Sequence, residues 1–220
     1  MSMPSQPGGF NLTGAEFVKE AHLLSEMPPD FGAEIAFAGR SNAGKSSVIN
    51  AFCNRRKLAR TSRTPGRTQQ FVVFEFAPGR RFIDLPGFGY AKVSKSKREH
   101  WAHEIPRYFS IRQSLIGLIL VADSRHELKT QELEVLNWCA SANLPTLLLL
   151  NKSDKLNQQQ AAKALRTLRS GIGSPDSSIT PMLFSATARR GIDSALSLIA
   201  QWFIDDEVDK AVANELGGLG

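Results

Sequence analysis

Residues 39–47, GRSNAGKSS, constrain the fold of this chain more than any other stretch. They contain the pattern G-x-x-x-x-G-K-S, in which glycines let the backbone turn so that several N–H groups point into one concave site. An apolar run, residues 34–38, precedes the pattern, and residues 48–52 can start a helix. A strand, a glycine-containing loop and a helix N-terminus in this order predict a site for a phosphate chain. A chance match in a glycine-containing turn would lack the strand before the pattern and the helix after it.

Two side chains of the loop add chemistry to this site. Lys45 would bring a positive charge to the outer phosphates, and the Ser46 hydroxyl is suited to bind Mg²⁺. We therefore expect Mg²⁺ as a cofactor.

Length and composition fit one globular domain. The chain has 220 residues, of which 42% are hydrophobic, enough for a full core. Its apolar runs, such as residues 115–122, have the length of a strand rather than of a membrane span. The first nine residues do not read as a secretion signal. Cys53 and Cys139 are therefore expected to be reduced core residues of a cytoplasmic protein rather than a disulfide or a metal pair.

Charge is distributed unevenly along the chain. Residues 40–112 hold sixteen Lys and Arg against four Asp and Glu, whereas the rest of the chain holds eleven against seventeen. Such an excess of positive charge favours contact with nucleic acid or another polyanion. The alternative is a solvated face with some charge serving the nucleotide, but this accounts for Lys45 and leaves most of the excess unexplained.

Strand patterns alternate with helix patterns. The expected strands are residues 34–38, 69–76, 81–84, 115–122, 144–150 and 181–185. The expected helices are a first helix ending near residue 54, residues 94–105, 127–140 and 157–169, and a closing helix with a buried stripe of Ile192, Ala195, Leu196, Ile199 and Phe203. The alternation predicts an α/β fold of the P-loop NTPase class, a three-layer α/β/α arrangement. Its sheet would be mainly parallel with one antiparallel hairpin strand, and would bind ligand at the carboxyl ends of the strands.

The remaining segments are less regular. Residues 1–30 are expected to form an N-terminal tail and a short lead-in segment, residues 31–205 the nucleotide-binding domain, and residues 206–220 a loose C-terminal tail. The lead-in pattern fits either a helix or an added edge strand. Residues 55–68 predict a long, mobile, basic loop, and residues 88–93 a second one. Pro106 is expected to end or kink the helix before it, and His100 and His103 are expected on an exposed helix face rather than at a metal.

Asp84-Leu85-Pro86-Gly87 follows the strand at residues 81–84, 39 residues after Lys45. In a nucleotide-binding sheet, an aspartate at this place holds a water on Mg²⁺, and the glycine N–H meets the terminal phosphate. The pattern alone is an ordinary turn, but its distance from the phosphate loop and the strand before it favour the nucleotide site.

Asn151-Lys152-Ser153-Asp154 follows the buried strand at residues 144–150. The Asp154 carboxylate can accept hydrogen bonds from N1–H and from the exocyclic amine of guanine. Adenine has no donor at N1, so the carboxylate would stay unpaired, which is costly. The Lys152 stem can lie over the base, and the backbone after Ser185 can donate to the guanine carbonyl. These features predict GTP rather than ATP.

The runs GRSNAGKSS, TPGRTQ and DLPGFGYA, with NKSD and the later Ser-Ala pair, resemble the EngB (YihA/YsxC) family of ribosome-biogenesis GTPases. This family belongs to the translation-factor-related GTPases, in the TrmE-Era-EngA-EngB-Septin-like superfamily. The resemblance covers about residues 30–205. It implies a bacterial GTPase that acts in assembly of the large ribosomal subunit and is needed for normal cell division and septation.

The resemblance also implies partners. These are GTP and GDP, and the ribosomal large-subunit precursor with its rRNA and ribosomal proteins; the protein would be a cytoplasmic monomer without a membrane partner. The alternative function is a regulatory GTP switch that acts mainly on proteins of the division machinery and does not bind rRNA directly.

Site residues follow from the same resemblance. The switch threonine that reaches Mg²⁺ is placed at Thr68, with Thr64 as the less favoured choice, while Ser46 would bind the metal directly and Asp84 through a water. Lys45, Thr68, Gly87 and Asn42 are the candidate catalytic residues. The residues expected to contact the nucleotide are Gly39, Arg40, Ser41, Asn42, Ala43, Gly44, Lys45, Ser46, Ser47, Gly66, Arg67, Thr68, Gln69, Gln70, Asp84, Leu85, Pro86, Gly87, Asn151, Lys152, Ser153, Asp154, Phe184, Ser185 and Ala186.

Phe88 stands where Ras-type GTPases carry the glutamine that positions the attacking water, and it cannot orient water by hydrogen bonds. We therefore expect slow intrinsic hydrolysis that an added group accelerates. One route is K⁺ bound at Asn42; the alternative is that Asn42 only shapes the turn. A second route is an element supplied by ribosomal RNA or protein. The γ-phosphate would order both loops, so that their basic residues contact rRNA only in the GTP form.

Overall fold

The apolar runs of the sequence form the strands of one sheet in the computed structural model, which describes residues 12–60, 70–88, 95–171 and 178–217. The strands are β1 (Glu16–Ala21), β2 (Ala33–Gly39), β3 (Phe71–Ala77), β4 (Arg80–Asp84), β5 (Leu115–Asp123), β6 (Thr146–Asn151) and β7 (Ile179–Leu183). The helices are α1 (Lys45–Phe52), α2 (Lys95–Ile111), α3 (Thr130–Ser141), α4 (Gln158–Gly171) and α5 (Ile192–Gly217), with short 3-10 turns η2 (Leu24–Glu26) and η3 (Ser153–Lys155).

The sheet has the strand order β1-β3-β4-β2-β5-β6-β7. β4, β2, β5, β6 and β7 run parallel, and β3 pairs antiparallel with both of its neighbours, β1 and β4. The prediction of a mainly parallel sheet with one antiparallel hairpin strand is therefore confirmed. Register places Gly39 beside Val121 and Asp123 beside Asn151, so the polar strand ends meet at one edge of the sheet.

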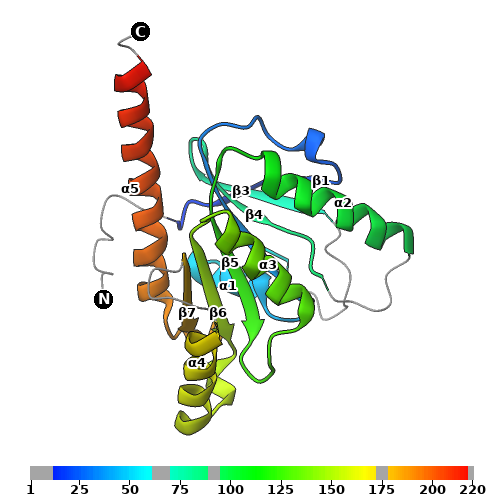
Figure 1. Ribbon diagram of the computed structural model, residues 1–220, viewed down its shortest axis with the longest axis vertical. Helices are drawn as coiled ribbons and strands as arrows, with labels where there is room; N and C mark the ends of the chain where they lie inside the picture. Colours follow the sequence, from blue (N-terminus) through cyan, green and yellow to red (C-terminus); the bar gives the residue numbers. More distant parts are fainter. Residues whose placement is uncertain (1–11, 61–69, 89–94, 172–177, 218–220) are drawn as a thin grey trace.

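Helices cover both faces of the sheet, as Figure 1 shows. One apolar cluster joins the sheet to α1 and α5 through residues such as Phe52 and Ile199, and the other joins it to α2, α3 and α4 through residues such as Tyr108, Leu136 and Leu165. The predicted three-layer α/β/α arrangement is confirmed. Among the described helices, none combines the length and the apolar character that crossing a bilayer requires.

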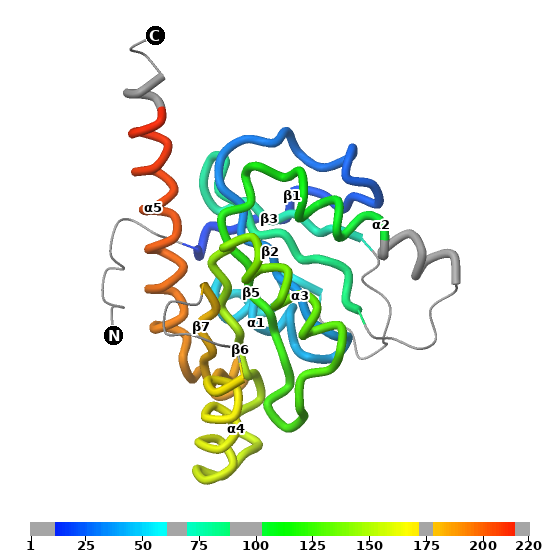
Figure 2. Tube along the Cα trace, viewed as in Figure 1, coloured from blue at the N-terminus to red at the C-terminus, as the bar shows by residue number. Residues whose placement is uncertain are grey.

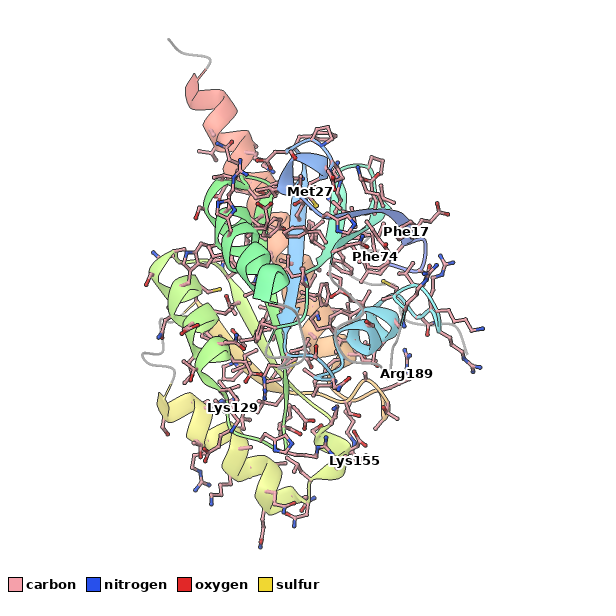
Figure 3. The ribbon with its side chains drawn as sticks, turned by 90° about the vertical axis from the view of Figure 1, so that its right-hand side faces the viewer. Phe17, Met27, Phe74, Lys129, Lys155 and Arg189 are labelled. Atoms are coloured by element: carbon pink, nitrogen blue, oxygen red, sulfur yellow. The ribbon has the colours of Figure 1, made fainter. Side chains whose placement is uncertain are left out.

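The lead-in segment forms the edge strand β1, which settles the choice between helix and strand. The Phe17 ring packs edge-on against Phe74 of β3, with the centroids 6.4 Å apart, and both rings lie in the upper part of the view in Figure 3. Ala21 and Leu24 are buried, although their spacing from Phe17 suits a helix as well. Pairing with β3 satisfies the backbone groups of the segment and decides for the strand.

The prediction that Pro106 ends or kinks the second helix is wrong about the ending, because α2 continues to Ile111. Residues after Pro106 make contacts that hold the last turns of α2 against the sheet. Arg112, directly after α2, donates from Nε and Nη2 to the two oxygens of Glu34, at 2.9 and 2.7 Å. The buried Tyr108 hydroxyl donates to the same carboxylate at 3.4 Å. Tertiary contacts thus outweigh the hydrogen bond that proline removes.

The Glu34 carboxylate is the centre of this buried network at the amino-terminal edge of the parallel strands. Its side chain is fully buried, and Arg81 of β4 donates to it at 3.2 Å. Arg81 also contacts Glu75 at 3.0 Å, and Arg112 lies 3.6 Å from Asp30. The network ties β2, β4 and the end of α2 together on the side of the sheet opposite the phosphate loop.

The prediction of a loose C-terminal tail over residues 206–220 is wrong as far as Gly217, since α5 runs through to that residue. Glu207 pairs with Arg80. Lys210 donates from Nζ to the Gly32 carbonyl at 2.6 Å and to Asp206 at 2.8 Å. These contacts anchor the first part of the acidic stretch to the sheet, and Figure 2 shows the helix extending beyond the rest of the fold.

Candidate nucleotide-binding site

The phosphate loop leaves the end of β2 and enters α1. Gly39 has φ 150° and Gly44 has φ 104°, conformations that side-chain-bearing residues rarely adopt. A Cβ at Gly39 would come within 2.3 Å of the Val121 carbonyl oxygen. Gly44 is the N-cap of α1, so the free N–H groups of the first helical turn face the loop. This arrangement is the concave, positively polarised site that a phosphate chain requires.

The middle of the loop is a tight turn. Ala43 donates its N–H to the Arg40 carbonyl at 3.0 Å, and Asn42 has φ 67° and an exposed side chain. Asparagine tolerates this left-handed conformation better than most residues, so its backbone agrees with the turn-shaping interpretation. Ser41 donates its N–H to the Phe88 carbonyl at 3.1 Å, which brings the segment after Gly87 against the loop.

Lys45, Asp84 and Gly87 meet beside this loop. Lys45 Nζ lies 3.7 Å from Asp84 Oδ1, an ion pair too long to be a hydrogen bond. A Cβ at Gly87 would lie 3.3 Å from both Lys45 Nζ and Ser41 Oγ, so the glycine borders the place where the terminal phosphate is expected. Ser46 follows in the first turn of α1 and is partly buried.

The Asp84 carboxylate is buried, and its Oδ1 has no hydrogen-bond partner among the described residues. Burial raises the pKa of Asp84, while the charge of Lys45 acts in the opposite direction. An acceptor left unpaired in this position fits a water held on Mg²⁺. The described residues contain no group of three or more His, Cys, Asp and Glu arranged for a metal, and Mg²⁺ at a phosphate loop depends on hydroxyl and phosphate oxygens instead.

Asn151 connects the phosphate loop to the loop after β7. It is buried, its Nδ2 donates to the Ala43 carbonyl at 2.9 Å, and its Oδ1 accepts from the Ala186 N–H at 3.2 Å. Both groups of the amide are therefore used. Figure 3 shows that Lys155, after β6, and Arg189, after β7, lie in the same lower part of the molecule. The two loops thus come together beside the phosphate loop.

Asp154 lies in η3, where Ser185 orients it. Ser185 is fully buried; its Oγ donates to Asp154 Oδ1 at 2.6 Å and accepts from the Ala188 N–H at 2.9 Å. The hydrogen bond from Ser185 lowers the pKa of Asp154. A fixed, ionised carboxylate beside the phosphate loop is what recognition of the N1–H and amine of guanine needs.

The other residues predicted to contact the nucleotide differ in where the structure places them. Gly66, Arg67, Thr68 and Gln69 are outside the described residues. Gln70 turns its amide to His22, after β1, instead of to the phosphate loop. Phe184 is fully buried, and its ring meets Phe52 edge-on.

Phe184 thus contributes its backbone, since its carbonyl accepts from the Ser153 N–H at 3.0 Å. Leu85 and Pro86 are buried behind the loop, where Leu85 N–H donates to the Phe37 carbonyl at 2.9 Å. The two histidines predicted on an exposed helix face belong to α2. The distance from His103 Nδ1 to Glu104 Oε1 is 3.1 Å, and the His100 side chain lies outside the described part of the structure.

The start of the predicted mobile loop is anchored, contrary to expectation. Asn50 of α1 donates to the Ala59 carbonyl and accepts from the Ala59 N–H, both at 2.8 Å, and Ala59 is buried. Arg55 donates to the Ala15 carbonyl at 2.7 Å. The signal in the sequence for this anchoring was Asn50, a polar residue within the otherwise apolar run of residues 48–52 in α1, because a buried amide needs hydrogen-bond partners. Residues 61–68 of the loop are outside the described residues.

One acidic residue of the site was missed by the sequence analysis. Asp123 ends β5 and accepts hydrogen bonds from Arg125 and Lys152. The signal existed in the sequence, because Asp123 follows a buried strand just as Asn151 does, but no motif marks it.

Comparison with known proteins agrees with this geometry. Residues 34–152 match the family model described as "50S ribosome-binding GTPase". A protein of Stenotrophomonas maltophilia named "Probable GTP-binding protein EngB" is 44% identical over 189 residues, covering 86% of this chain and 94% of the relative. The Xanthomonas axonopodis pv. citri protein of the same name is 42% identical over 204 residues, covering 92% of this chain and 95% of the relative.

Solved structures share the fold. The crystal structure of a probable GTP-binding protein engB has a TM-score of 0.63 at 25% identity, covering 79% of this chain and all of that one. A variant of Aquifex aeolicus Era bound to GDP.AlF4- has a TM-score of 0.62 at 19% identity, covering 77% of this chain and 56% of that one, a likeness of fold alone. With its phosphate loop, guanine-type carboxylate and matched sequence, the chain belongs to the EngB family of GTP-binding proteins, whose GTPase domain hydrolyses GTP.

Proposed function

We propose that this GTPase is a molecular switch in assembly of the large ribosomal subunit. The observation that carries the proposal is the meeting of the phosphate loop, Asp84 and the Ser185–Asp154 pair at one edge of the sheet, in a chain that matches a family described as 50S ribosome-binding. The protein would act as a cytoplasmic monomer that needs no membrane.

The nucleotide would lie along this edge, with its phosphates over residues 39–47 and its guanine against Asp154 and Lys152. Ser46 and Thr68 would hold Mg²⁺ directly, and Asp84 would hold it through a water. When bound, Mg²⁺ would neutralise charge on the β- and γ-phosphate oxygens. Lys45 would contact the same oxygens, and the Gly87 N–H the terminal phosphate.

Hydrolysis would be slow without an activator. Phe88 follows Gly87 and has no group to orient the attacking water. Either K⁺ bound at Asn42 or an element of the ribosome would supply the missing charge. Turnover measured in K⁺ and in Na⁺, with and without large-subunit precursors, distinguishes the two routes; identical turnover in both salts under both conditions excludes the cation.

The described part of the basic segment supports a contact with rRNA. Arg56, Lys57 and Arg60 are exposed, and no carboxylate among the described residues pairs with them. They follow α1 directly and lead into the loop that carries Thr68. Cations with no carboxylate partner among the described residues, close in sequence to the expected switch threonine, suit rRNA phosphates that would be contacted only in the GTP form.

Co-sedimentation with large-subunit precursors in a non-hydrolysable GTP analogue, at several salt concentrations, tests this function. The wild type should bind more tightly with the analogue than with GDP, and binding should fall steeply with salt. Replacing Arg56, Lys57 and Arg60 by Gln should lower the affinity for the precursors and should also make that affinity less dependent on salt. The matched control replaces Lys163, Arg166 and Arg169, three exposed cations on α4, by Gln. Equal binding of the GDP and GTP forms would refute the switch.

A further inference from the structure

The Asp123 carboxylate lies between two cations beside the phosphate loop. Arg125 donates to both of its oxygens, from Nε to Oδ1 at 2.8 Å and from Nη2 to Oδ2 at 2.6 Å. Lys152 donates from Nζ to Oδ2 at 2.9 Å. Because Asp123 ends β5 in register with Asn151 of β6, the sheet itself fixes the carboxylate next to the lysine.

Lys152 also contacts the phosphate loop. Its Nζ donates to the Asn42 carbonyl at 2.6 Å, so one ammonium group joins the ends of two strands to the loop. The backbone of Lys152 is left-handed, with φ 66°, a conformation that side-chain-bearing residues rarely adopt. Asp123 and the Asn42 carbonyl together hold the far end of a side chain that otherwise has much rotamer freedom.

The three side chains differ in exposure. The side chain of Asp123 is 15% exposed, that of Lys152 29%, and that of Arg125 45%. Partial burial alone would raise the pKa of Asp123, but the hydrogen bonds from Arg125 and Lys152 lower it well below its ordinary range, so the carboxylate stays ionised. Charge-assisted hydrogen bonds in a partly buried place are stronger than neutral ones.

A cavity of about 280 Å³ opens over these residues. Its lining includes Arg40 to Ala43 of the phosphate loop, Asp123 and Arg125 to Leu128 after β5, and Glu132 and Lys152. The Arg125–Asp123–Lys152 chain therefore runs along the wall of an open cavity beside the nucleotide site.

We propose that Asp123 is a positioning residue for guanine-nucleotide binding: it holds Lys152 against the phosphate loop, and Arg125 holds Asp123 in turn. The inference rests on the proposed function, in which the Lys152 stem lies over the base. A lysine that is already fixed loses less conformational freedom when the nucleotide binds, and it keeps the loop carbonyl of Asn42 in place. Losing the restraint therefore speeds nucleotide release.

The release rate of a fluorescent GDP analogue from the full-length protein tests this role. Asp123→Asn removes the charge and should speed release about tenfold, while Arg125→Gln removes only the outer restraint and should speed it about threefold. Glu127→Gln is the matched control, because Glu127 lies in the same loop, lines the same cavity and carries the same charge. Its release rate should equal that of the wild type.

A double-mutant cycle separates positioning from a merely structural role. In a Lys152→Ala background, Asp123→Asn should add little further effect on release, because Asp123 acts through the lysine. Fully independent, additive effects overturn the proposal. The unfolding temperature of each nucleotide-free variant is measured alongside; if Asp123→Asn fails to fold, the exposed Arg125→Gln decides, and an unchanged release rate there overturns the proposal.

The control outcomes separate this inference from the proposed function. A wild type that does not retain the GDP analogue contradicts the nucleotide site itself. A wild type that retains it while Asp123→Asn releases it at the same rate contradicts only the role of Asp123.

Discussion

Asn151 packs its side-chain amide directly against Gly44, so closely that a Cβ on Gly44 would come within 2.4 Å of Nδ2. The same Nδ2 holds the Ala43 carbonyl, and the Oδ1 accepts from Ala186. The phosphate loop, the end of β6 and the loop after β7 therefore share one buried amide. The two halves of the nucleotide site cannot shift independently while this contact exists.

The contact predicts that Gly44→Ala abolishes guanine-nucleotide binding. Alanine at φ 104° is strained, and its methyl group would displace the Asn151 amide. We expect at least about a 100-fold loss of GDP affinity, because backbone strain and the displaced amide together cost about 3 kcal/mol, and each tenfold in affinity corresponds to about 1.4 kcal/mol. Isothermal titration calorimetry measures it. Gly14→Ala, where a Cβ meets no atom within 4 Å, is the control and should bind GDP normally.

Asp154→Asn should exchange guanine for xanthine nucleotides. An amide presents a donor where the carboxylate presents an acceptor, and xanthine carries a carbonyl where guanine carries its exocyclic amine. Competition of xanthosine and guanosine diphosphates for the site measures the change. Asp209→Asn, an exposed residue of α5, should leave guanine preference unchanged. If Asp154→Asn still prefers guanosine diphosphate, the base assignment is wrong.

Ser185→Ala should make GDP binding more sensitive to acid. The pKa of Asp154 lies below its ordinary value of 3.8, chiefly because Ser185 donates to it, so the carboxylate becomes neutral only as the pH falls through that lowered pKa. Without Ser185 the pKa rises, and the base contact is lost at a higher pH. GDP affinity measured in both proteins from pH 7 down to about pH 3, a range that spans the ordinary pKa of 3.8, tests this.

The comparison cancels the titration of the phosphates, which is the same in both proteins. Parallel pH profiles would show that Ser185 does not control the ionisation of Asp154.

Glu34→Gln should destabilise the fold without weakening nucleotide binding. It removes the charge that faces two buried guanidinium groups, Arg81 and Arg112, at the edge of the sheet opposite the phosphate loop. Removing the acidic partner of a buried ion cluster, which leaves the cations unpaired, lowers the free energy of unfolding by about 3 kcal/mol. Urea titration measures this loss. Glu75→Gln removes a more exposed partner of Arg81 and should cost less than about 1 kcal/mol.

Local patterns were enough where a residue's role depends on its neighbours in the chain. The glycines, Lys45 and Ser46 occupy fixed positions in one loop, and NKSD follows a buried strand directly, so the sequence predicted them as site residues. The C-terminal helix was predicted too short, because the acidic composition after Asp205 favoured a loose tail. Its contacts to Arg80 and Gly32 come from residues far away in the chain, where no local pattern records them.

The sequence by itself determined the fold class, the order of strands and helices after the lead-in segment, and the guanine-type motifs, because strand and helix periodicities and strand-end motifs are local properties of the chain. Only the tertiary structure decided that Asn151 is hydrogen-bonded to the phosphate loop, Ser185 to Asp154, and Asp123 to Lys152. Those relationships join residues that are far apart in sequence and meet at one edge because the parallel strands stand in register. Pairing across the sheet, which no single stretch of sequence encodes, set that register.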